Sequence, residues 1–599
     1  MTRNADQLRA KYRAERDKRI RPEGADQYIT PTGEWASLFD DPYTEVVHRE
    51  PQRREVDALI VGAGFSGLIM GAKLRQAGVD DFVMLDRAGD VGGVWYWNRY
   101  PGAMCDTAAM VYLPLVEETG TVPSMKYVPG YEIHQHAQRI ANTFNLYDRF
   151  FGSTEIRSIV WDESSQRWIV TTDRGDEFRA RFVTVGTGPI ARPKLPGIPG
   201  IEKFMGTAFH TSRWNYDYTG GDRFNSPMTK LADKRVGIIG TGATGVQVVP
   251  HVARTAKEFF VFQRTPSSID VRNNEPIDPS WFANLETGWQ KKWLMNFTTL
   301  QTGGFTDVDL VKDGWTDISK RIRDRVVSLV TERGEYSLEI QQEAYEASDD
   351  EKMEEIRARV DAVVRDPATA EALKPWYRQL CKRPCFHDEY LQSFNLPSVH
   401  LVDTDGRGVE RIDETGVWVN GVHYELDCLI YASGFEVGNE QTGENSLPIV
   451  GAGGVSLHEY WSEGMLTYLG LFTREFPNLF HMSIAQGANL VSNIPHNYWA
   501  AADAIAAVIS HAAASGATRV EASQASQDEW VSGIATNTRS LFGNPDCTPG
   551  YYNNEGRGFG PRERLNSTGY PLGAVAYFEL VETWSNSGEF VGLEFSAPR

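Results

Sequence analysis

Cysteine is scarce in this chain, and its distribution excludes two classes of site. The 599 residues include only five cysteines, at positions 105, 381, 385, 428 and 547. No two of them form a CxxC pair, so the sequence supports neither a zinc ribbon nor a dithiol redox centre. We expect Cys381 and Cys385 to be packing thiols, because no second ligand pair lies near them. A reducing, cytoplasmic environment fits this cysteine usage best.

Long apolar runs and an excess of positive charge are also lacking. No stretch approaches the roughly 18 apolar residues of a membrane span, and the most apolar candidate helix, 498–514, is interrupted by Asp503 and His511. We expect that segment to be a core helix. The formal net charge of −20 argues against nucleic-acid or membrane partners. The sequence leaves the choice between a monomer and a homodimer open.

Motifs of metal sites and of hydrolases are missing as well. His134 and His136 have no third ligand at metal spacing, so we expect them on the surface and expect no metal site. No Gly-x-Ser-x-Gly segment supports hydrolysis.

The chain does contain two strand–turn–helix units with glycine-rich turns. In the first, Gly62, Gly64 and Gly67 follow an apolar strand and open a helix. The first glycine permits a tight turn, the second lets the backbone approach a pyrophosphate, and the third lets helix and strand pack closely. Asp86 ends the next strand, where a carboxylate accepts the ribose hydroxyls of an adenosine. This unit predicts a dinucleotide site.

The second unit repeats the glycine pattern with Gly240, Gly242 and Gly245. Arg264 stands at the position, counted from the first glycine, that Asp86 occupies in the first unit. A guanidinium binds a 2′-phosphate where a carboxylate repels it, so we expect NADPH here, with Thr265 as a neighbouring contact. The alternative is that Arg264 is only a solvated charge at a strand end.

A Gly-Gly loop and a dense run of aromatic residues, 89–106, follow the first unit. Gly93 favours close backbone approach, and Trp95 suits the wall of a large flat ring such as flavin. Two dinucleotide sites in one chain imply that a hydride passes between two cofactors. We therefore expect FAD at the first site and NADPH at the second.

At this point the chain resembles the type I Baeyer–Villiger monooxygenases over roughly residues 54 to 535. One family pattern is met by Phe204, Gly206, His210 and Trp214. A second is met by Gly93, Trp95, Tyr100, Pro101, Gly102 and Asp106. Asn215 stands where the family has Pro or Asp, and it keeps the turn preference of Asp without its charge. The resemblance implies an α/β fold with two Rossmann-like dinucleotide-binding domains, for FAD and NADPH, and a helical insertion.

The resemblance also implies which residues do the chemistry. The family's catalytic arginine follows a lysine after the helical insertion, which points to Arg383 and Lys382. In that family reduced flavin adds dioxygen and the anionic peroxide attacks a ketone carbonyl, so the resemblance implies that Arg383 stabilises these anions. Asp106 resembles the acid that holds this arginine, and Lys382 would contact NADP. Without the resemblance, Lys382 and Arg383 would be an ordinary surface basic pair.

The expected activity is an NADPH- and O2-dependent insertion of one oxygen atom next to a ketone carbonyl, giving an ester or lactone. The extension at 1–54 and the tail segment 549–557 resemble a subgroup that takes bulky cyclic ketones. Two alternatives stay open: a flavin monooxygenase that oxidises nitrogen or sulfur, and a nucleotide-sensing protein without turnover. Placement of His210 between the two nucleotide units favours a structural role in their connection over acid–base catalysis.

The same patterns predict the order of units along the chain. They are an N-terminal extension (1–54, anchored by Leu8, Tyr12 and Ile20), an FAD domain in two parts (55–190 and 431–599, the latter with the tail), an NADPH domain in two parts (191–268 and 381–430) and a helical insertion (269–380).

Overall fold

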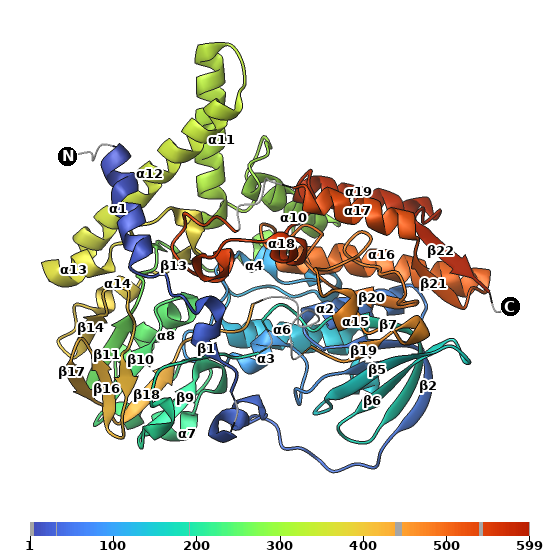
Figure 1. Ribbon diagram of the computed structural model, residues 1–599, viewed down its shortest axis with the longest axis horizontal. Coiled ribbons are helices and arrows are strands. Elements are labelled where there is room, and N and C mark those ends of the chain that lie inside the picture. Colours follow the sequence, from blue (N-terminus) through green and yellow to red (C-terminus); the bar gives the residue numbers. More distant parts are fainter. Residues whose placement is uncertain (1–4, 32, 191, 438–445, 538–542, 598–599) are drawn as a thin grey trace.

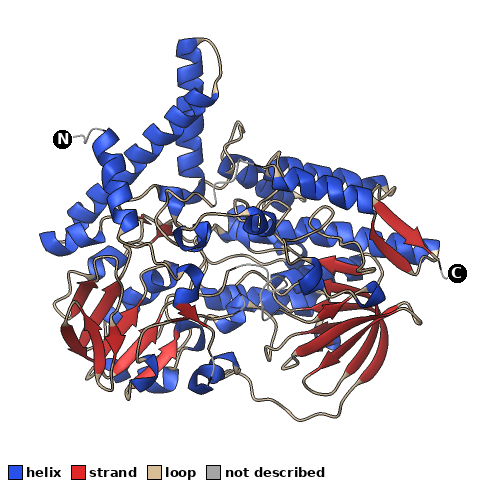
Figure 2. Cartoon of the chain, viewed as in Figure 1, coloured by secondary structure: helices blue, strands red, loops and turns tan. Residues whose placement is uncertain are grey.

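The computed structural model describes residues 5–31, 33–190, 192–437, 446–537 and 543–597. Residues 538–542, at the start of the predicted tail, lie outside this part of the chain. In Figure 1 two strand regions lie on opposite sides of the lower half of the molecule, and Figure 2 shows helices above and between them.

The larger sheet has eight strands in the order β19-β5-β6-β7-β2-β3-β4, with β20 paired to β7. Its central strands β2 (Arg53–Val61), β3 (Phe82–Leu85) and β7 (Glu177–Val185) are parallel neighbours. Where all three strands lie side by side, at 58–61, 82–85 and 182–185, their residues are buried and almost all apolar, as expected for a parallel sheet covered on both faces. The other strands are β4 (Phe150–Phe151), β5 (Ile156–Asp162), β6 (Arg167–Thr172), β19 (Ile449–Val450) and β20 (Leu479–His481).

The smaller sheet is entirely parallel, in the order β14-β11-β10-β18-β9. Its strands are β9 (Thr207–His210), β10 (Arg235–Ile239), β11 (Glu258–Gln263), β14 (Val399–Asp403) and β18 (Cys428–Tyr431). The glycine-rich turns join β2 to α2 (Phe65–Gln76) in one sheet and β10 to α8 (Ala243–Ala253) in the other. The predicted α/β class with two Rossmann-like units is confirmed.

A helical excursion separates β12 (Ile269–Asp270) from β13 (Cys385–Phe386). It contains α9 (Pro279–Phe282), α10 (Trp289–Gln301), α11 (Gly314–Arg333), α12 (Leu338–Val363) and α13 (Pro367–Leu373). The two long helices α11 and α12 project from the body (Figure 1). Because β12 and β13 pair in parallel, the excursion leaves and returns at one place.

The N-terminal helix α1 (Ala5–Asp17) packs on this helical excursion. Leu8 and Tyr12 are buried as expected, and Arg357 of α12 donates a hydrogen bond to the Tyr12 hydroxyl. Ile20 was expected to be a third anchor, but its side chain is 45% exposed. Leu8 and Tyr12 of α1 therefore anchor the start of the extension, and β1 (Tyr28–Ile29) anchors its later part by pairing with β8 (Leu195–Pro196).

The expected core helix is α16 (Ile494–Ser515), whose apolar residues lie in the largest hydrophobic cluster. Within the described residues no helix has the length and apolar character needed to cross a bilayer. In that same part of the chain, no three His, Cys, Asp or Glu side chains gather as a metal site would require.

The interpretation of Cys381 as a packing thiol is wrong. Cys381 forms a disulfide with Cys547, and the bond joins the segment before Lys382 to the C-terminal tail. Spacing along the sequence cannot reveal a partner 166 residues away. Cys105, Cys385 and Cys428 are free and buried.

Removing the disulfide should destabilise the protein. Closing a loop of this length lowers the entropy of the unfolded chain by the equivalent of about 5 kcal/mol. We expect C381S, C547S and the double variant to lower the thermal midpoint by a similar several degrees, because each loses the same bond. Thiol labelling of denatured, unreduced wild type should modify only the three free cysteines. Labelling of all five, or additive losses in the double variant, would contradict the bond.

Candidate functional site

The first glycine-rich turn is built by close backbone contacts. Gly62 has φ +94°, and a Cβ there would lie 2.5 Å from the carbonyl oxygen of Gly186. A Cβ on Gly67 would collide with the Gly62 carbonyl, so α2 packs directly on its own strand. Gly64 caps α2 without a side chain, which leaves the first N–H groups of the helix facing the turn. This is an N-terminus suited to a pyrophosphate.

The Gly-Gly loop lies against this turn. Gly93 has φ +55°, and a Cβ there would lie 2.8 Å from the Cα of Gly64. It precedes α3 (Val94–Trp97), in which the Trp95 indole donates to the Tyr112 hydroxyl at 2.9 Å. The two glycine loops therefore meet without side chains between them. Trp95 lies in the first turn of α3, directly after this contact.

Asp86 lies at the carboxyl end of β3 beside the same turn. Its two carboxylate oxygens accept hydrogen bonds from the backbone N–H of Ala63, at 2.6 Å, and of Ala88, at 2.8 Å. Burial raises the pKa of this carboxyl, and the two N–H groups oppose that shift. Asp86 thus links the glycine turn to the next strand, at the position expected for a ribose contact.

The second turn has the same construction with a more open centre. A Cβ on Gly240 would collide with the Ala432 carbonyl, and one on Gly245 would collide with the Gly240 carbonyl. No heavy atom lies within 4 Å of a Cβ built on Gly242. The middle glycine therefore leaves room for a ligand next to the N-terminus of α8.

Arg264 follows β11 and contacts both the N-terminal extension and the C-terminal tail. It donates to the side-chain oxygen of Gln27, and its guanidinium lies 3.6 Å from the buried carboxylate of Glu555. These two partners come from the N-terminal extension and the C-terminal tail. Sequence reasoning missed them, because neither segment carries a nucleotide motif.

Thr265 and Lys382 lie near Arg264. The Thr265 hydroxyl is buried, and within the described residues it has no hydrogen-bond partner. Burial, and then the charges of Arg264 and Arg19, lower the pKa of Lys382 to about 8. An unsatisfied hydroxyl and a group of like charges are features that a bound phosphate would stabilise.

The two residues predicted to be catalytic are in direct contact. The Arg383 guanidinium donates to both carboxylate oxygens of Asp106, at 2.5 and 2.9 Å. The Asp106 side chain is 3% exposed, whereas that of Arg383 is 32% exposed. Asp106 thereby fixes the position of the Arg383 guanidinium at the base of the helical excursion.

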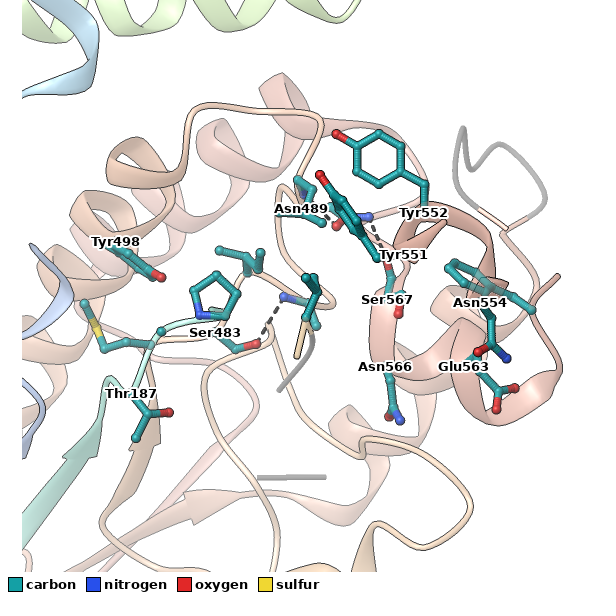
Figure 3. Close-up of a pocket in the computed structure, with 18 of the residues that line it drawn as sticks. Thr187, Ser483, Asn489, Tyr498, Tyr551, Tyr552, Asn554, Glu563, Asn566 and Ser567 are labelled. Atoms are coloured by element: carbon teal, nitrogen blue, oxygen red, sulfur yellow. Dashed lines mark hydrogen bonds between the residues drawn. The ribbon is translucent and has the colours of Figure 1, made fainter. Parts of the chain in front are cut away.

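A cavity of about 250 Å³ lies between the larger sheet and the tail. Figure 3 shows Thr187, Ser483 and Tyr498 on one side and Tyr551 and Tyr552 on the other. Burial raises the pKa of Tyr552, and the charge of Arg383 is the largest opposing influence. The tail therefore forms one wall of the cavity, a role that its sequence did not reveal.

His210 has structural partners on both ring nitrogens. Its Nδ1 accepts from the Ser212 N–H at 3.2 Å, and its Nε2 lies 3.0 Å from the carbonyl oxygen of Gly434. Burial lowers the pKa of His210 to about 3, so the ring is neutral. Asn215 accepts from the Tyr218 N–H at 2.9 Å and caps a short helix, α7 (Tyr216–Thr219), which is the turn role expected for it.

Three other histidines are structural. His134 and His136 were expected on the surface, but both are buried on α6 (Gly130–Thr143). The Nε2 of His134 contacts the Val91 carbonyl at 2.9 Å beside the Gly-Gly loop, and the Nε2 of His136 contacts the Pro114 carbonyl at 2.6 Å. His387 accepts the backbone N–H groups of Glu389 and Tyr390 on its Nδ1, at 3.0 and 3.2 Å, just before and at the start of α14 (Tyr390–Ser393), which is a structural role.

Comparison with known proteins gives consistent results. Residues 59–302 match the family described as pyridine nucleotide-disulphide oxidoreductase. The chain is 47% identical to neopentalenolactone D synthase of Streptomyces avermitilis, over 98% of each chain. It is 46% identical to a Baeyer–Villiger monooxygenase of Streptomyces coelicolor, over 96% of this chain and 95% of the relative.

Solved structures agree. The polycyclic ketone monooxygenase of Thermothelomyces thermophila is 36% identical, superposes with a TM-score of 0.89, and the match covers 99% of both chains. Identity at this level over whole chains, with the same pair of nucleotide-binding units, places the protein in one family: the chain belongs to the flavin-dependent Baeyer–Villiger monooxygenases.

Proposed function

We propose that this chain is an NADPH- and O2-dependent enzyme that inserts one oxygen atom next to the carbonyl of a bulky cyclic ketone, giving an ester or lactone. The observation that carries the proposal is the bidentate Arg383–Asp106 pair, with a cation fixed on a buried carboxylate. The size of the ketone is supported by the names of two relatives, neopentalenolactone D synthase and the polycyclic ketone monooxygenase.

The residues at the first turn fit FAD. Gly62, Gly64 and Gly93 form a cradle that any Cβ would fill, and the N-terminus of α2 faces it. Asp86 is the candidate ribose ligand and Trp95 a candidate wall for the flavin ring. When bound, FAD that NADPH has reduced supplies the activated oxygen.

The residues at the second turn fit NADPH. Gly242 is open, the Thr265 hydroxyl lacks a partner among the described residues, and Arg264 and Lys382 supply positive charge. We infer that Arg264, Thr265 and Lys382 hold the 2′-phosphate. The Arg264 guanidinium would then contact both that phosphate and the carboxylate of Glu555.

Arg383 is the proposed catalytic residue. A guanidinium stays protonated where water is excluded, so it stabilises negative charge that develops on the ketone oxygen. Asp106 fixes the plane of the guanidinium through two hydrogen bonds and offsets its charge. A heteroatom oxidation has no carbonyl oxygen that needs such a cation, so this geometry favours ketone oxidation.

We propose that the two sheets correspond to the units at 55–190 with 431–599 and at 191–268 with 381–430. A cytoplasmic location is also a proposal, supported by the need for NADPH. The Cys381–Cys547 bond would then have to persist against a reducing pool, and both cysteines are buried.

Replacing Arg383 tests the proposed function. We expect R383A to keep oxidising NADPH but to form ester from a polycyclic ketone about 100-fold more slowly, because one anion-stabilising donor group is lost. R383K should be intermediate. Arg157→Ala, at an exposed position on β5, is the control. NADPH loss is followed by absorbance and ester by chromatography. Ester formation by R383A at the wild-type rate would refute the assignment.

The glycine cradle has its own test. We expect G93A to lose most of its bound flavin, because the new Cβ would separate the two loops. G78A is matched, since Gly78 also has a positive φ, +76°, but has no atom within 4 Å of a built Cβ. The ratio of flavin to protein absorbance in purified protein gives the answer. Equal flavin content in both variants would show that FAD does not bind at this turn.

The pH dependence of NADPH use should reflect the loss of the proton from the Lys382 ammonium group. Only the protonated ammonium attracts a phosphate, so kcat/KM for NADPH should fall as the pH rises through about 8, the pKa of Lys382 in the free enzyme. K382R should remove this step, because arginine stays charged. An unchanged step in K382R would show that another group titrates.

A further inference from the structure

The N-terminus of α11 lies directly against the Arg383–Asp106 pair. The Trp315 indole N–H donates to the main-chain carbonyl oxygen of Asp106 at 3.1 Å. The Arg383 guanidinium lies over the Trp315 ring, 5.2 Å from its centroid. One side chain of the helical excursion thus contacts both members of the pair.

Asp313 adds a second link between the excursion and the Asp106 segment. One of its carboxylate oxygens accepts from the Trp315 N–H at 2.9 Å and so caps α11. The other accepts from the Ala108 N–H, also at 2.9 Å. Asp313 is buried, so both bonds are made away from water and contribute more than exposed ones would.

A third contact fixes α11 to the strand that follows Arg383. The rings of Trp315 and Phe386 meet edge to face with centroids 5.5 Å apart. A Cβ on Gly314 would collide with the Phe386 ring, so the first turn of α11 packs against β13 without a side chain between them. Asp106 and Arg383 are therefore held from one helix end, although they lie far apart in the sequence.

We propose that Asp313 and Trp315 are positioning residues that set the orientation of Arg383 through Asp106. The inference rests on the proposed role of Arg383. Asp106 can direct the guanidinium only if its own main chain is fixed, and Asp313 and Trp315 hold that chain at residues 106 and 108. The helical excursion then has a function: it supplies the support for the reacting centre from outside both nucleotide-binding units.

Substitutions that remove single contacts test the proposal. W315F keeps an aromatic ring and loses the N–H donor to Asp106. W315L loses that donor and also the ring that contacts Arg383 and Phe386. D313N leaves one of the two backbone N–H groups without its acceptor. We expect the ester formed per NADPH oxidised to fall about threefold in W315F and about tenfold in W315L and D313N, because small displacements of a catalytic group are costly. KM for NADPH should stay unchanged.

Matched controls come from the same excursion. D309N makes the same chemical change in the preceding turn, where Asp309 accepts from Val311, Lys312 and Thr316 and not from residues 106–108. W281F removes an indole N–H at an exposed position on α9. Both should keep the wild-type ratio of ester to NADPH.

Hydrogen exchange gives a readout that does not depend on turnover. Peptides covering 104–110 or 313–317 should exchange faster in D313N than in D309N, since either the Ala108 N–H or the Trp315 N–H loses its acceptor. If wild type forms no ester from any ketone, the proposed function fails, and the exchange result still decides the positioning role. Wild-type ester ratios and wild-type exchange in both W315L and D313N would overturn it. Should D313N not fold, the two Trp315 variants decide alone.

Discussion

The buried carboxylate of Asp106 requires a positively charged partner, and the rest of the site is arranged around the ion pair that it forms with Arg383. Asp106 is almost fully buried, and an unpaired charge there would cost several kcal/mol. Arg383 meets the cost with two hydrogen bonds and remains partly exposed. The pair joins the segment after the first nucleotide turn to the segment after the helical excursion, so forming it requires most of the chain to be in place.

The N-terminal extension and the C-terminal tail meet near the same region. Gln27 of the extension and Glu555 of the tail contact Arg264, and the Cys381–Cys547 bond ties the tail to the residues before Lys382. The tail then lines the cavity with Tyr551 and Tyr552. A segment outside the two glycine-rich turns thus forms part of the cavity wall.

Several side chains that belong to sequence motifs, and could therefore be taken for catalytic residues or metal ligands, have structural roles. His210 is neutral and hydrogen-bonded at both nitrogens, and it holds β9 near Gly434. His134, expected at the surface, supports the Gly-Gly loop from within. Short patterns do not reveal burial for a residue on a helix such as α6, because burial depends on which other elements pack against that helix.

The sequence alone determined the two nucleotide turns, the α/β class and the family. Each of these depends on residues close in the chain, where the lack of a Cβ or the end of a strand acts locally. The contact between Arg383 and Asp106 was predicted only from the resemblance to the family. Tertiary structure alone decided the disulfide, the Glu555–Arg264 contact and the support from Asp313 and Trp315. These contacts join residues far apart in sequence, and no local pattern encodes a pairing that exists only after the sheets and the helical excursion have packed.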